Sequence, residues 1–312
     1  METTMLEQKI HKWSHRNIAR TLVCAMLLWA MILGNLWTPA QAHASTLPKT
    51  KSHAYTIING QNGERIAGKK EDNRIYPAST AKMMTALVVL EHSDVDDEIT
   101  FTKKMSKKVP GGASRIYLTP GRTYTVESYL TMLLLKSDAD SAEALAYGVA
   151  GGPKKFIRWM NLKAKSLGMN HTSYDNPIGM DVGNGFKKTY ATAADYGILA
   201  YQAMQNPTIR KIVARHKARI TSVDGASSFI CVSTNGFYGS YKKLLKKADY
   251  KIIGTKTGTT NAAGHCLVAT AVDSEGREVI VCFYGNDGSE RMYKDIKKLF
   301  DYAYRVLDAS EA

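Results

Sequence analysis

A serine and a lysine stand three residues apart at the start of an apolar segment. They are Ser79 and Lys82, and almost every residue from Lys82 to Leu90 is apolar. If this segment is a helix, the spacing places the hydroxyl and the amine on one face, and the helix is predicted to be buried. Burial and the positive N-terminal end of the helix both lower the pKa of an amine. A neutral amine beside a hydroxyl can act as the base that activates a serine nucleophile.

The same spacing occurs a second time, in Ser240-Tyr241-Lys242-Lys243. At average serine and lysine usage, a chain of this length holds about one such match by chance. The second match lies in a basic run, 241–247, without an apolar helical pattern, and it is predicted to be solvated surface. The spacing alone is therefore a weak indication, and the function of Ser79 depends on motifs further along the chain.

A second group of candidate residues lies at the end of a strand pattern that begins near Tyr250. It reads Lys256-Thr257-Gly258-Thr259, and the K-T-G triplet occurs once in the chain. A glycine on a strand leaves room for another backbone to approach. The lysine and the two threonine hydroxyls are suited to bind a carboxylate beside that strand. The alternative interpretation is an ordinary strand end with a bulge.

A third candidate, Ser137, lies between these two groups. It follows the leucines at 133–135 and begins the sequence Ser137-Asp138-Ala139-Asp140. The serine ends one predicted helix and is positioned to cap the next one. That structural role would not exclude a role in catalysis.

Periodic patterns divide the rest of the chain into three parts. Two short strand patterns at 53–58 and 64–68 flank turn residues and predict a hairpin. Helical patterns follow at 79–90, 125–135, 140–149, 153–167, 192–205 and 207–214, with a short strand at 99–102. Strand patterns return at 219–223, 250–257, 265–272 and 278–283, before a closing helix at 289–307. They predict an α+β fold with an antiparallel sheet built from N- and C-terminal strands, flanking helices and an all-helical insert at about 103–215.

The first forty residues have the pattern of an export signal. Four basic residues precede an apolar run at 21–37, and an A-x-A sequence follows at 40–42. This order is typical of a secretory signal peptide, so we expect residues 1–42 to be removed and residues 43–312 to form a single domain. Cleavage after Ala44, or retention as a membrane anchor, are the alternatives. N-terminal sequencing of the secreted protein checks the prediction, because the chain should begin at His43 or Ser45.

Charge and cysteine content restrict the partners of the protein. The formal net charge is +14, and it is +12 without residues 1–42. Nothing resembles a nucleic-acid-binding module, so the basic character indicates an anionic envelope polymer or a solvated basic face. Without residues 1–42 three of the four cysteines remain, Cys231, Cys266 and Cys282, and this odd number leaves at least one of them unpaired. No cysteine or histidine spacing resembles a metal site, and we expect no cofactor.

The three motifs occur in the order S-x-x-K, serine motif and K-T-G, and this order resembles the serine-lysine penicillin-recognising enzymes. Within them the sequence is most similar to the low-molecular-mass D-alanyl-D-alanine carboxypeptidases. The resemblance covers about 53–307 and includes two connecting segments, at 176–181 and 192–197. It implies a DD-peptidase/β-lactamase-like fold, and it makes 43–312 the catalytic domain.

The resemblance implies a catalytic role for three residues. Ser79 is the acylated nucleophile, Lys82 is the base that takes its proton, and Ser137 relays a proton to the leaving D-alanine. Water then hydrolyses the acyl-enzyme. The implied function is a secreted DD-carboxypeptidase that removes the terminal D-alanine from peptidoglycan stem peptides during cell-wall synthesis or remodelling.

Substrate binding is implied for the K-T-G strand. Lys256, Thr257 and Thr259 hold the terminal carboxylate of the substrate, and Gly258 completes the motif. The backbone N–H groups of Ser79 and Thr259 form the oxyanion hole, where negative charge develops during acyl transfer. β-Lactam antibiotics are expected as covalent inhibitors.

One position departs from the family pattern. The second motif is usually S-x-N, and its third position here is Ala139. The asparagine normally forms hydrogen bonds with the substrate and with the lysine of the first motif. Asp138 or Asp140 is a candidate for partial replacement. If neither compensates, Ala139→Asn should recover part of an acylation rate that is about five- to 150-fold low.

Several alternatives remain for the function. An endopeptidase that cleaves crosslinks would carry the same residues. A class A β-lactamase would carry E-x-x-L-N, which the sequence lacks, and only Ala139 favours a wall-binding protein with a decayed site. We expect an exported protein, periplasmic or extracellular, that acts on stem peptides ending in D-Ala-D-Ala and not on nucleic acid. Because the sequence ends soon after Leu307, no C-terminal membrane anchor is expected.

Overall fold

The computed structural model describes residues 46–181 and 189–311. Within them, Thr46–Leu307 form one compact unit. The expected signal peptide, 1–42, lies outside the described residues. None of the helices in the described part of the chain has the length and hydropathy that a membrane span requires.

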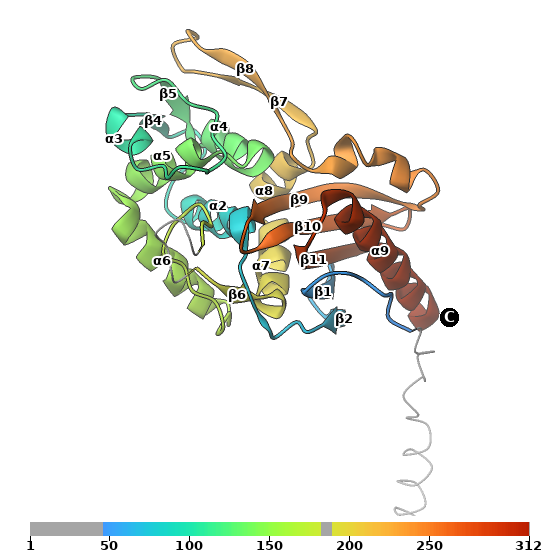
Figure 1. The fold of residues 1–312 in the computed structure, drawn as a ribbon. Helices are drawn as coiled ribbons and strands as arrows, with labels where there is room; N and C mark the ends of the chain where they lie inside the picture. Colours follow the sequence, from blue (N-terminus) through green and yellow to red (C-terminus); the bar gives the residue numbers. More distant parts are fainter. Residues whose placement is uncertain (1–45, 182–188, 312) are drawn as a thin grey trace, which may run out of the picture. The chain divides into compact units, whose positions relative to one another are not determined.

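A five-stranded antiparallel sheet forms the centre of the unit (Figure 1). In spatial order its strands are β2 (Arg65–Lys69), β1 (Ala54–Asn59), β11 (Glu278–Asn286), β10 (Gly264–Asp273) and β9 (Tyr250–Thr260). The two terminal parts of the chain meet where β1 pairs with β11, with Thr56 opposite Cys282. The sheet is therefore built from N-terminal and C-terminal strands, which confirms the predicted fold class.

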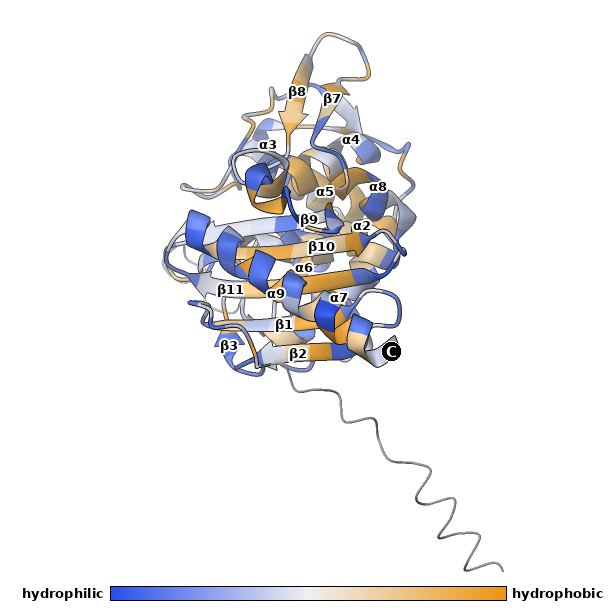
Figure 2. Ribbon diagram, turned by 90° about the vertical axis from the view of Figure 1, so that its right-hand side faces the viewer, coloured by the Kyte–Doolittle hydropathy of each residue, from blue (hydrophilic) through white to orange (hydrophobic). Residues whose placement is uncertain are grey.

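The sheet separates two hydrophobic cores, because successive side chains of a strand point to opposite faces. On one face Val268 and Cys282 pack in a core shared with helices α2 (Lys82–Leu90) and α7 (Ala193–Gln205). On the other face Leu267 and Val281 pack against α9 (Ser289–Glu311). Figure 2 shows that the side of α9 turned away from the sheet is largely hydrophilic. The sheet that carries the K-T-G motif is therefore packed against helices on both of its faces.

The α-helices other than α9 all lie between β2 and β9 in the described part of the chain. Besides α2 and α7, these helices are α3 (Lys103–Ser106), α4 (Val126–Thr131), α5 (Ala139–Ala150), α6 (Pro153–Ser166) and α8 (Pro207–Val213). Two pairs of short strands lie among them, β3 (Arg74–Ile75) with β6 (Ala191–Thr192) and β4 (Glu98–Thr100) with β5 (Thr123–Thr125). The insert at 103–215 thus holds β5 and β6 as well as helices, because strands of two or three residues leave no periodic pattern.

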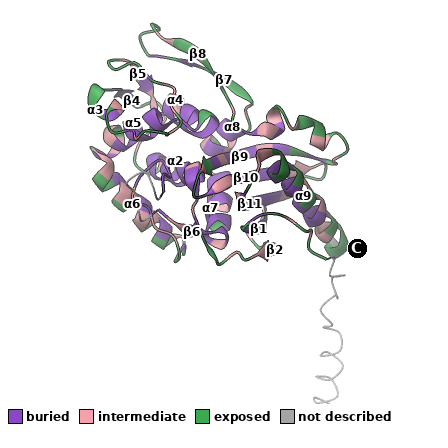
Figure 3. Ribbon diagram, viewed as in Figure 1, coloured by how far each residue is buried: buried purple, intermediate pink, exposed green. Residues whose placement is uncertain are grey.

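A hairpin of β7 (Lys217–Thr221) and β8 (Ser228–Val232) precedes the last strands. The sequence pattern predicted a strand at 219–223 and none at 228–232. Apolar residues of β8 fall on both of its faces, since Cys231 is buried while Ile230 and Val232 are exposed. Without alternation the strand has no sequence signature. Figure 3 shows how much of the hairpin is exposed.

The helix predicted at 125–135 changes its form in the middle. Its first part is α4, and its second part is a π-helix, η2 (Met132–Lys136). The carbonyl of Leu135 accepts a hydrogen bond from the N–H of Thr234 at 2.9 Å, outside the helix. The helix then ends at Ser137, which has φ 62° and ψ 31°. Such single π-turns are often found at functional sites.

A register shift in β9 determines on which face of the sheet the side chains at each end of this strand lie. The shift lies opposite Thr270 and Ala271 of β10. Before it, Ile252 belongs to the core under α9. After it, Lys256 pairs with Val268 and lies on the face covered by α2. A bulge of this kind re-aims the side chains that follow it, and here it turns the K-T-G motif toward Ser79.

Candidate active site

Ser79 and Lys82 lie at a junction between two kinds of helix. The segment predicted as one helix is a 3₁₀ turn, η1 (Ala78–Ala81), followed by α2. The Nζ of Lys82 donates a hydrogen bond to the Oγ of Ser79 at 3.0 Å. Ser79 is half-buried, whereas Lys82 is only 2% exposed. The hydroxyl is therefore accessible, while the amine beside it is withdrawn from water.

Burial determines the charge of this amine. It lowers the pKa of Lys82 to about 7, although the carboxylate of Asp138 favours the ammonium form. The same Nζ donates a second hydrogen bond, to the carbonyl oxygen of Ile178 at 2.8 Å. A lysine with a pKa near 7 can accept a proton from a serine hydroxyl at neutral pH. The geometry and the charge state thus both suit a general base.

The loop that holds Lys82 was noted in the sequence only as a family segment. The Oδ1 of Asn176 accepts hydrogen bonds from the N–H groups of Ile178, Gly179 and Met180, at 3.2, 2.7 and 3.0 Å. This tight turn presents the carbonyl of Ile178 to the amine. The Asn-Pro-x-Gly sequence is a recognisable turn signal. Its contact with a helix far back in the chain leaves no such signal.

The same loop presses on the residue before the nucleophile. Gly179 has φ +83°, and a Cβ at this position would lie 1.9 Å from the carbonyl oxygen of Ala78. Ala78 itself has φ 48°, a left-handed conformation that is strained for a residue with a side chain. The backbone that leads into Ser79 is therefore held in an unusual shape by a neighbour that must be glycine.

Gly258 brings β9 against the nucleophile. A Cβ on Gly258 would lie 3.0 Å from the backbone N of Ser79 and 3.1 Å from both Ala78 Cβ and Pro77 O. The strand is the last one in the sheet, and its outer edge has no partner strand in the described part of the chain. The N–H of Ser79 and the open edge of β9 therefore lie side by side. The sequence interpretation, a glycine that permits close approach, describes this contact.

Lys256 is a second buried amine near the first. It is 1% exposed, and its Nζ donates a hydrogen bond to the carbonyl oxygen of Thr257 at 2.8 Å. Burial holds the pKa of Lys256 well below its ordinary value, and the positive charge of Lys82 lowers it further. An anion entering the site would favour the ammonium form of either amine. The pair therefore forms a site that suits a carboxylate.

The two threonines of the motif have different surroundings. The hydroxyl of Thr257 shares a hydrogen bond of 2.5 Å with that of Thr234, whose N–H also binds Leu135. Thr234 thus connects β9 to η2, and no sequence pattern predicted this connection. Thr259 is exposed, and its hydroxyl donates to the carbonyl of Gly258 at 2.8 Å.

Ser137 does not cap the following helix, contrary to the interpretation from the sequence. The cap of α5 is Asp138, whose carboxylate accepts a hydrogen bond from the N–H of Ser141 at 2.8 Å. Ser137 is strained in the left-handed region, and its buried Oγ has no hydrogen-bond partner among the described residues. Its helix, η2, contacts both α2 and β9. A buried hydroxyl without a partner retains its capacity to bond a substrate.

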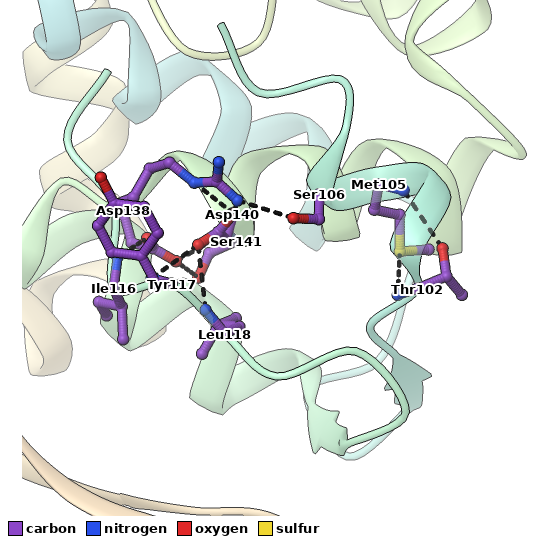
Figure 4. A network of polar contacts seen from close by, with 10 residues as sticks. Thr102, Met105, Ser106, Ile116, Tyr117, Leu118, Asp138, Asp140 and Ser141 are labelled. Carbon is purple, nitrogen blue, oxygen red and sulfur yellow. Dashed lines mark hydrogen bonds and ion pairs between the residues drawn. The ribbon is translucent and has the colours of Figure 1, made fainter. Parts of the chain in front are cut away.

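The two aspartates beside Ala139 are occupied in a structural network (Figure 4). Asp138 accepts from the N–H of Ile116 at 2.7 Å, and Asp140 accepts from the N–H of Tyr117 at 2.9 Å. Asp140 also accepts two hydrogen bonds from Arg115, at 2.9 and 2.6 Å. These carboxylates fasten a loop to the start of α5. Both carboxylates are therefore engaged in this network, and Asp138 also favours the ammonium form of Lys82.

The second S-x-x-K match lies on the surface of the protein. Ser240, Lys242 and Lys243 are exposed, which confirms the prediction of a solvated surface.

Among the described residues, no group of three or more histidine, cysteine, aspartate or glutamate side chains could hold a metal ion. The arrangement around Ser79 supports acyl transfer through a serine nucleophile.

Comparison with known proteins agrees with this arrangement. Residues 40–287, which contain all three motifs, match the family described as D-alanyl-D-alanine carboxypeptidase, peptidase S11. The chain belongs to this family. The match confirms the resemblance seen in the sequence and places the protein among the serine hydrolases of peptidoglycan metabolism.

Relatives in the D-alanyl-D-alanine carboxypeptidase family have different reaction names. The carboxypeptidase DacF of Bacillus subtilis is 28% identical over 253 residues, which cover 80% of this chain and 61% of DacF. A D-alanyl-D-alanine endopeptidase of Escherichia coli is 31% identical over 251 residues, covering 78% of this chain and 76% of that one. The crystal structure of the Streptomyces K15 DD-transpeptidase has a TM-score of 0.74 at 30% identity, covering 84% of this chain and 100% of that one.

These comparisons define a family and not a substrate. This chain matches less than two thirds of the length of DacF. The three relatives are named for a carboxypeptidase, an endopeptidase and a transpeptidase reaction. Membership in the D-alanyl-D-alanine carboxypeptidase family therefore leaves open which peptide bond this chain cleaves.

The burial of Ala139 changes what we expect of Ala139→Asn, the variant that carries the family's usual asparagine. Ala139 has no exposed surface, and its N–H donates to the carbonyl of Ser114 at 2.9 Å. A larger side chain must therefore displace packed neighbours. We expect Ala139→Asn to lower the free energy of unfolding by about 1–3 kcal/mol without accelerating acylation. Denaturant unfolding and the acylation rate with a chromogenic penicillin measure both effects.

Ala139→Ser, which adds one atom, is the matched control for size. It should lose less stability than Ala139→Asn, because it displaces less of the packed surroundings, and it should keep the wild-type acylation rate. Faster acylation by Ala139→Asn at unchanged stability would show that the pocket has room for the amide, and the argument from burial would be wrong.

Proposed function

We propose that the protein is an exported serine DD-carboxypeptidase that removes the terminal D-alanine from peptidoglycan stem peptides. The reaction would pass through an acyl-enzyme on Ser79. The observation that supports this most directly is the 3.0 Å hydrogen bond between the buried amine of Lys82 and the hydroxyl of Ser79. The open edge of β9 beside it gives an extended peptide a place to bind.

Substrate binding follows from the positions along β9. The terminal carboxylate lies near Lys256 and the hydroxyl of Thr257, and its negative charge favours the ammonium form of Lys256. The scissile carbonyl then lies near Ser79, with its oxygen facing the N–H groups of Ser79 and Thr259. The close approach of Gly258 to Ser79 supports this placement. The rest of the stem peptide continues past the end of β9.

Acylation begins when the Nζ of Lys82 accepts the proton of the Ser79 hydroxyl. The Oγ attacks the carbonyl carbon of the penultimate D-alanine, and the carbonyl oxygen becomes an oxyanion stabilised by the two backbone N–H groups. The C–N bond then breaks as the leaving nitrogen receives a proton. We assign the relay of that proton from Lys82 to Ser137, and its buried hydroxyl, which has no hydrogen-bond partner among the described residues, supports this assignment. D-Alanine departs, and an ester on Ser79 remains.

Deacylation repeats the same steps with water as the nucleophile. Lys82 accepts a proton from water, the resulting hydroxide attacks the ester carbonyl, and the proton returns to the Oγ of Ser79. The products are the shortened peptide and the free enzyme. No group beyond these side chains and two backbone N–H groups is required, since acyl transfer needs only a nucleophile, a base and an oxyanion site.

The role of Lys256 gives a prediction about substrate charge. We expect Lys256→Ala to lower kcat/KM about ten- to a thousandfold for a peptide with a free terminal carboxylate, and much less for the same peptide as its terminal amide. The reason is that only the carboxylate has a negative charge that attracts the buried amine. Steady-state assays with the two peptides measure the ratio. Equal losses on both would indicate misfolding or a general electrostatic role.

The reaction is tested with two purified peptidoglycan fragments, a stem pentapeptide and a crosslinked dimer, with Ser79→Ala as the blank. Free D-alanine from the pentapeptide is the expected product. Preferential cleavage of the dimer would favour an endopeptidase, the reaction named for the E. coli relative. Rapid turnover of penicillin would indicate a β-lactamase, and absence of any acylation would indicate a wall-binding protein.

A further inference from the structure

A basic surface surrounds a pocket at the end of β9 opposite the catalytic residues. The segment 241–251 contains five lysines and one aspartate, a formal net charge of +4. It includes the short 3₁₀ helix η4 (Lys242–Leu245), and Lys242, Lys243, Lys246 and Lys251 line the pocket. All four are exposed, and none has an ion-pair partner within 46–181 and 189–311. Their charge is therefore not compensated in the described part of the protein.

The walls of this pocket are apolar. Its volume is about 560 Å³, and its non-lysine lining is mainly Phe237, Tyr238, Leu245, Tyr250 and Ile252. The two tyrosine hydroxyls are used inside the protein, since Tyr238 donates to a carbonyl at 3.1 Å and Tyr250 to a carboxylate at 2.9 Å. The rings thus present carbon to the pocket. In Figure 3 the segment before β9 is coloured largely exposed and intermediate.

We propose that this pocket binds the surface of a membrane that contains anionic lipids. The lysines would contact the headgroup phosphates, and the pocket would take up an apolar part of a lipid. Unpaired lysines attract an anionic surface, while apolar walls stabilise only a ligand with a hydrocarbon part. A soluble polyanion would match the charge and leave the apolar walls unused. The two features together therefore favour an amphiphile.

The position of the pocket is compatible with catalysis at a membrane surface. Lys251 and Gly258 lie on one strand, so the two sites are separated by about 24 Å at a rise of about 3.4 Å per residue. The register shift between them turns the catalytic end toward α2 and leaves the other end on the side of α9. Lipid binding would thus leave the edge of β9 near Ser79 open. This inference does not depend on which peptide bond the enzyme cleaves.

Vesicle co-sedimentation tests the proposal, with vesicles of pure phosphatidylcholine and of phosphatidylcholine mixed equally with phosphatidylglycerol. The first variant replaces Lys242, Lys243, Lys246 and Lys251 by glutamine, and a second is Leu245→Gln. The matched control replaces four other exposed lysines by glutamine: Lys103, Lys107, Lys154 and Lys165. All proteins carry the same N-terminal segment, so its contribution to binding cancels. Inorganic polyphosphate serves as the soluble polyanion.

We expect the partition coefficient for anionic vesicles to fall at least about tenfold in the first variant. It should fall several-fold in Leu245→Gln and less than twofold in the control. Equal losses in the first variant and the control would show that only total charge matters and would overturn the proposal. So would equal binding to both kinds of vesicle. An unchanged partition for Leu245→Gln, with polyphosphate as an efficient competitor, would identify a polyanion site instead.

Discussion

Ser79→Ala is expected to abolish covalent labelling by penicillin and to slow the release of D-alanine at least about 10⁴-fold. The hydroxyl is the only part of the side chain that the substitution removes, and no other serine in the three motifs has a lysine amine at hydrogen-bond distance. Because Ser79 is half-buried and small, the fold should persist. A fluorescent penicillin on a denaturing gel and mass spectrometry of the tryptic peptide measure the result.

Ser240→Ala is the matched control, because Ser240 has the same S-x-x-K spacing on an exposed surface. It should label like the wild type. An adduct on the peptide that contains Ser240, or labelling that survives in Ser79→Ala, would refute the assignment of the nucleophile. Thermal unfolding of both variants shows whether a loss of labelling results from a loss of the fold.

The rate of acylation should depend on pH through Lys82. Burial lowers the pKa of this amine to about 7, so the base is neutral and active above that pH and protonated below it. The acylation rate should therefore be nearly constant above pH 7 and fall about tenfold for each unit below it. Lys82→Met, which keeps the length and removes the base, should lose about 10²–10⁴-fold at all pH values.

Stopped-flow acylation with a chromogenic penicillin between pH 5 and pH 9 measures this profile on the scale of the expected pKa. Lys82→Arg is a useful companion, since its side chain keeps the charge and cannot give up its proton at any of these pH values. It should be as slow as Lys82→Met. A wild-type rate that keeps rising up to pH 9 would mean that the amine is charged in the resting enzyme at neutral pH.

The local parts of the site were predictable from the sequence, and the reason is geometric. Ser79 and Lys82 are neighbours on successive turns, so their contact follows from helical spacing alone. Gly258 could be interpreted as a close approach because a glycine in a strand has few other causes. Strand patterns were recognised near both ends of the chain, and their union in one sheet confirms the fold class.

Contacts between distant segments could not be predicted in the same way. The carbonyl of Ile178 that holds Lys82, and the hydroxyl of Thr234 that holds Thr257, are ordinary groups whose role depends on tertiary position. The cap of α5 was assigned to Ser137 from the sequence, although an aspartate in the next position is an equally good helix cap. The structure places the cap on Asp138 and leaves Ser137 strained, with a hydroxyl that has no hydrogen-bond partner within 46–181 and 189–311.

The pairing of β1 with β11 has a consequence for how the enzyme acquires its activity. Thr56 lies opposite Cys282, so almost the whole length of the unit separates two residues that are neighbours in the sheet. Contacts between residues so far apart in the sequence form slowly. The long loop between them must close, at a cost in chain entropy, before the contact can stabilise the fold. While the chain is being synthesised, the N-terminal hairpin has no strand to pair with. Neither β9 nor the nucleophile that depends on it can assemble until the last strands have emerged, so the unfinished polypeptide is catalytically silent.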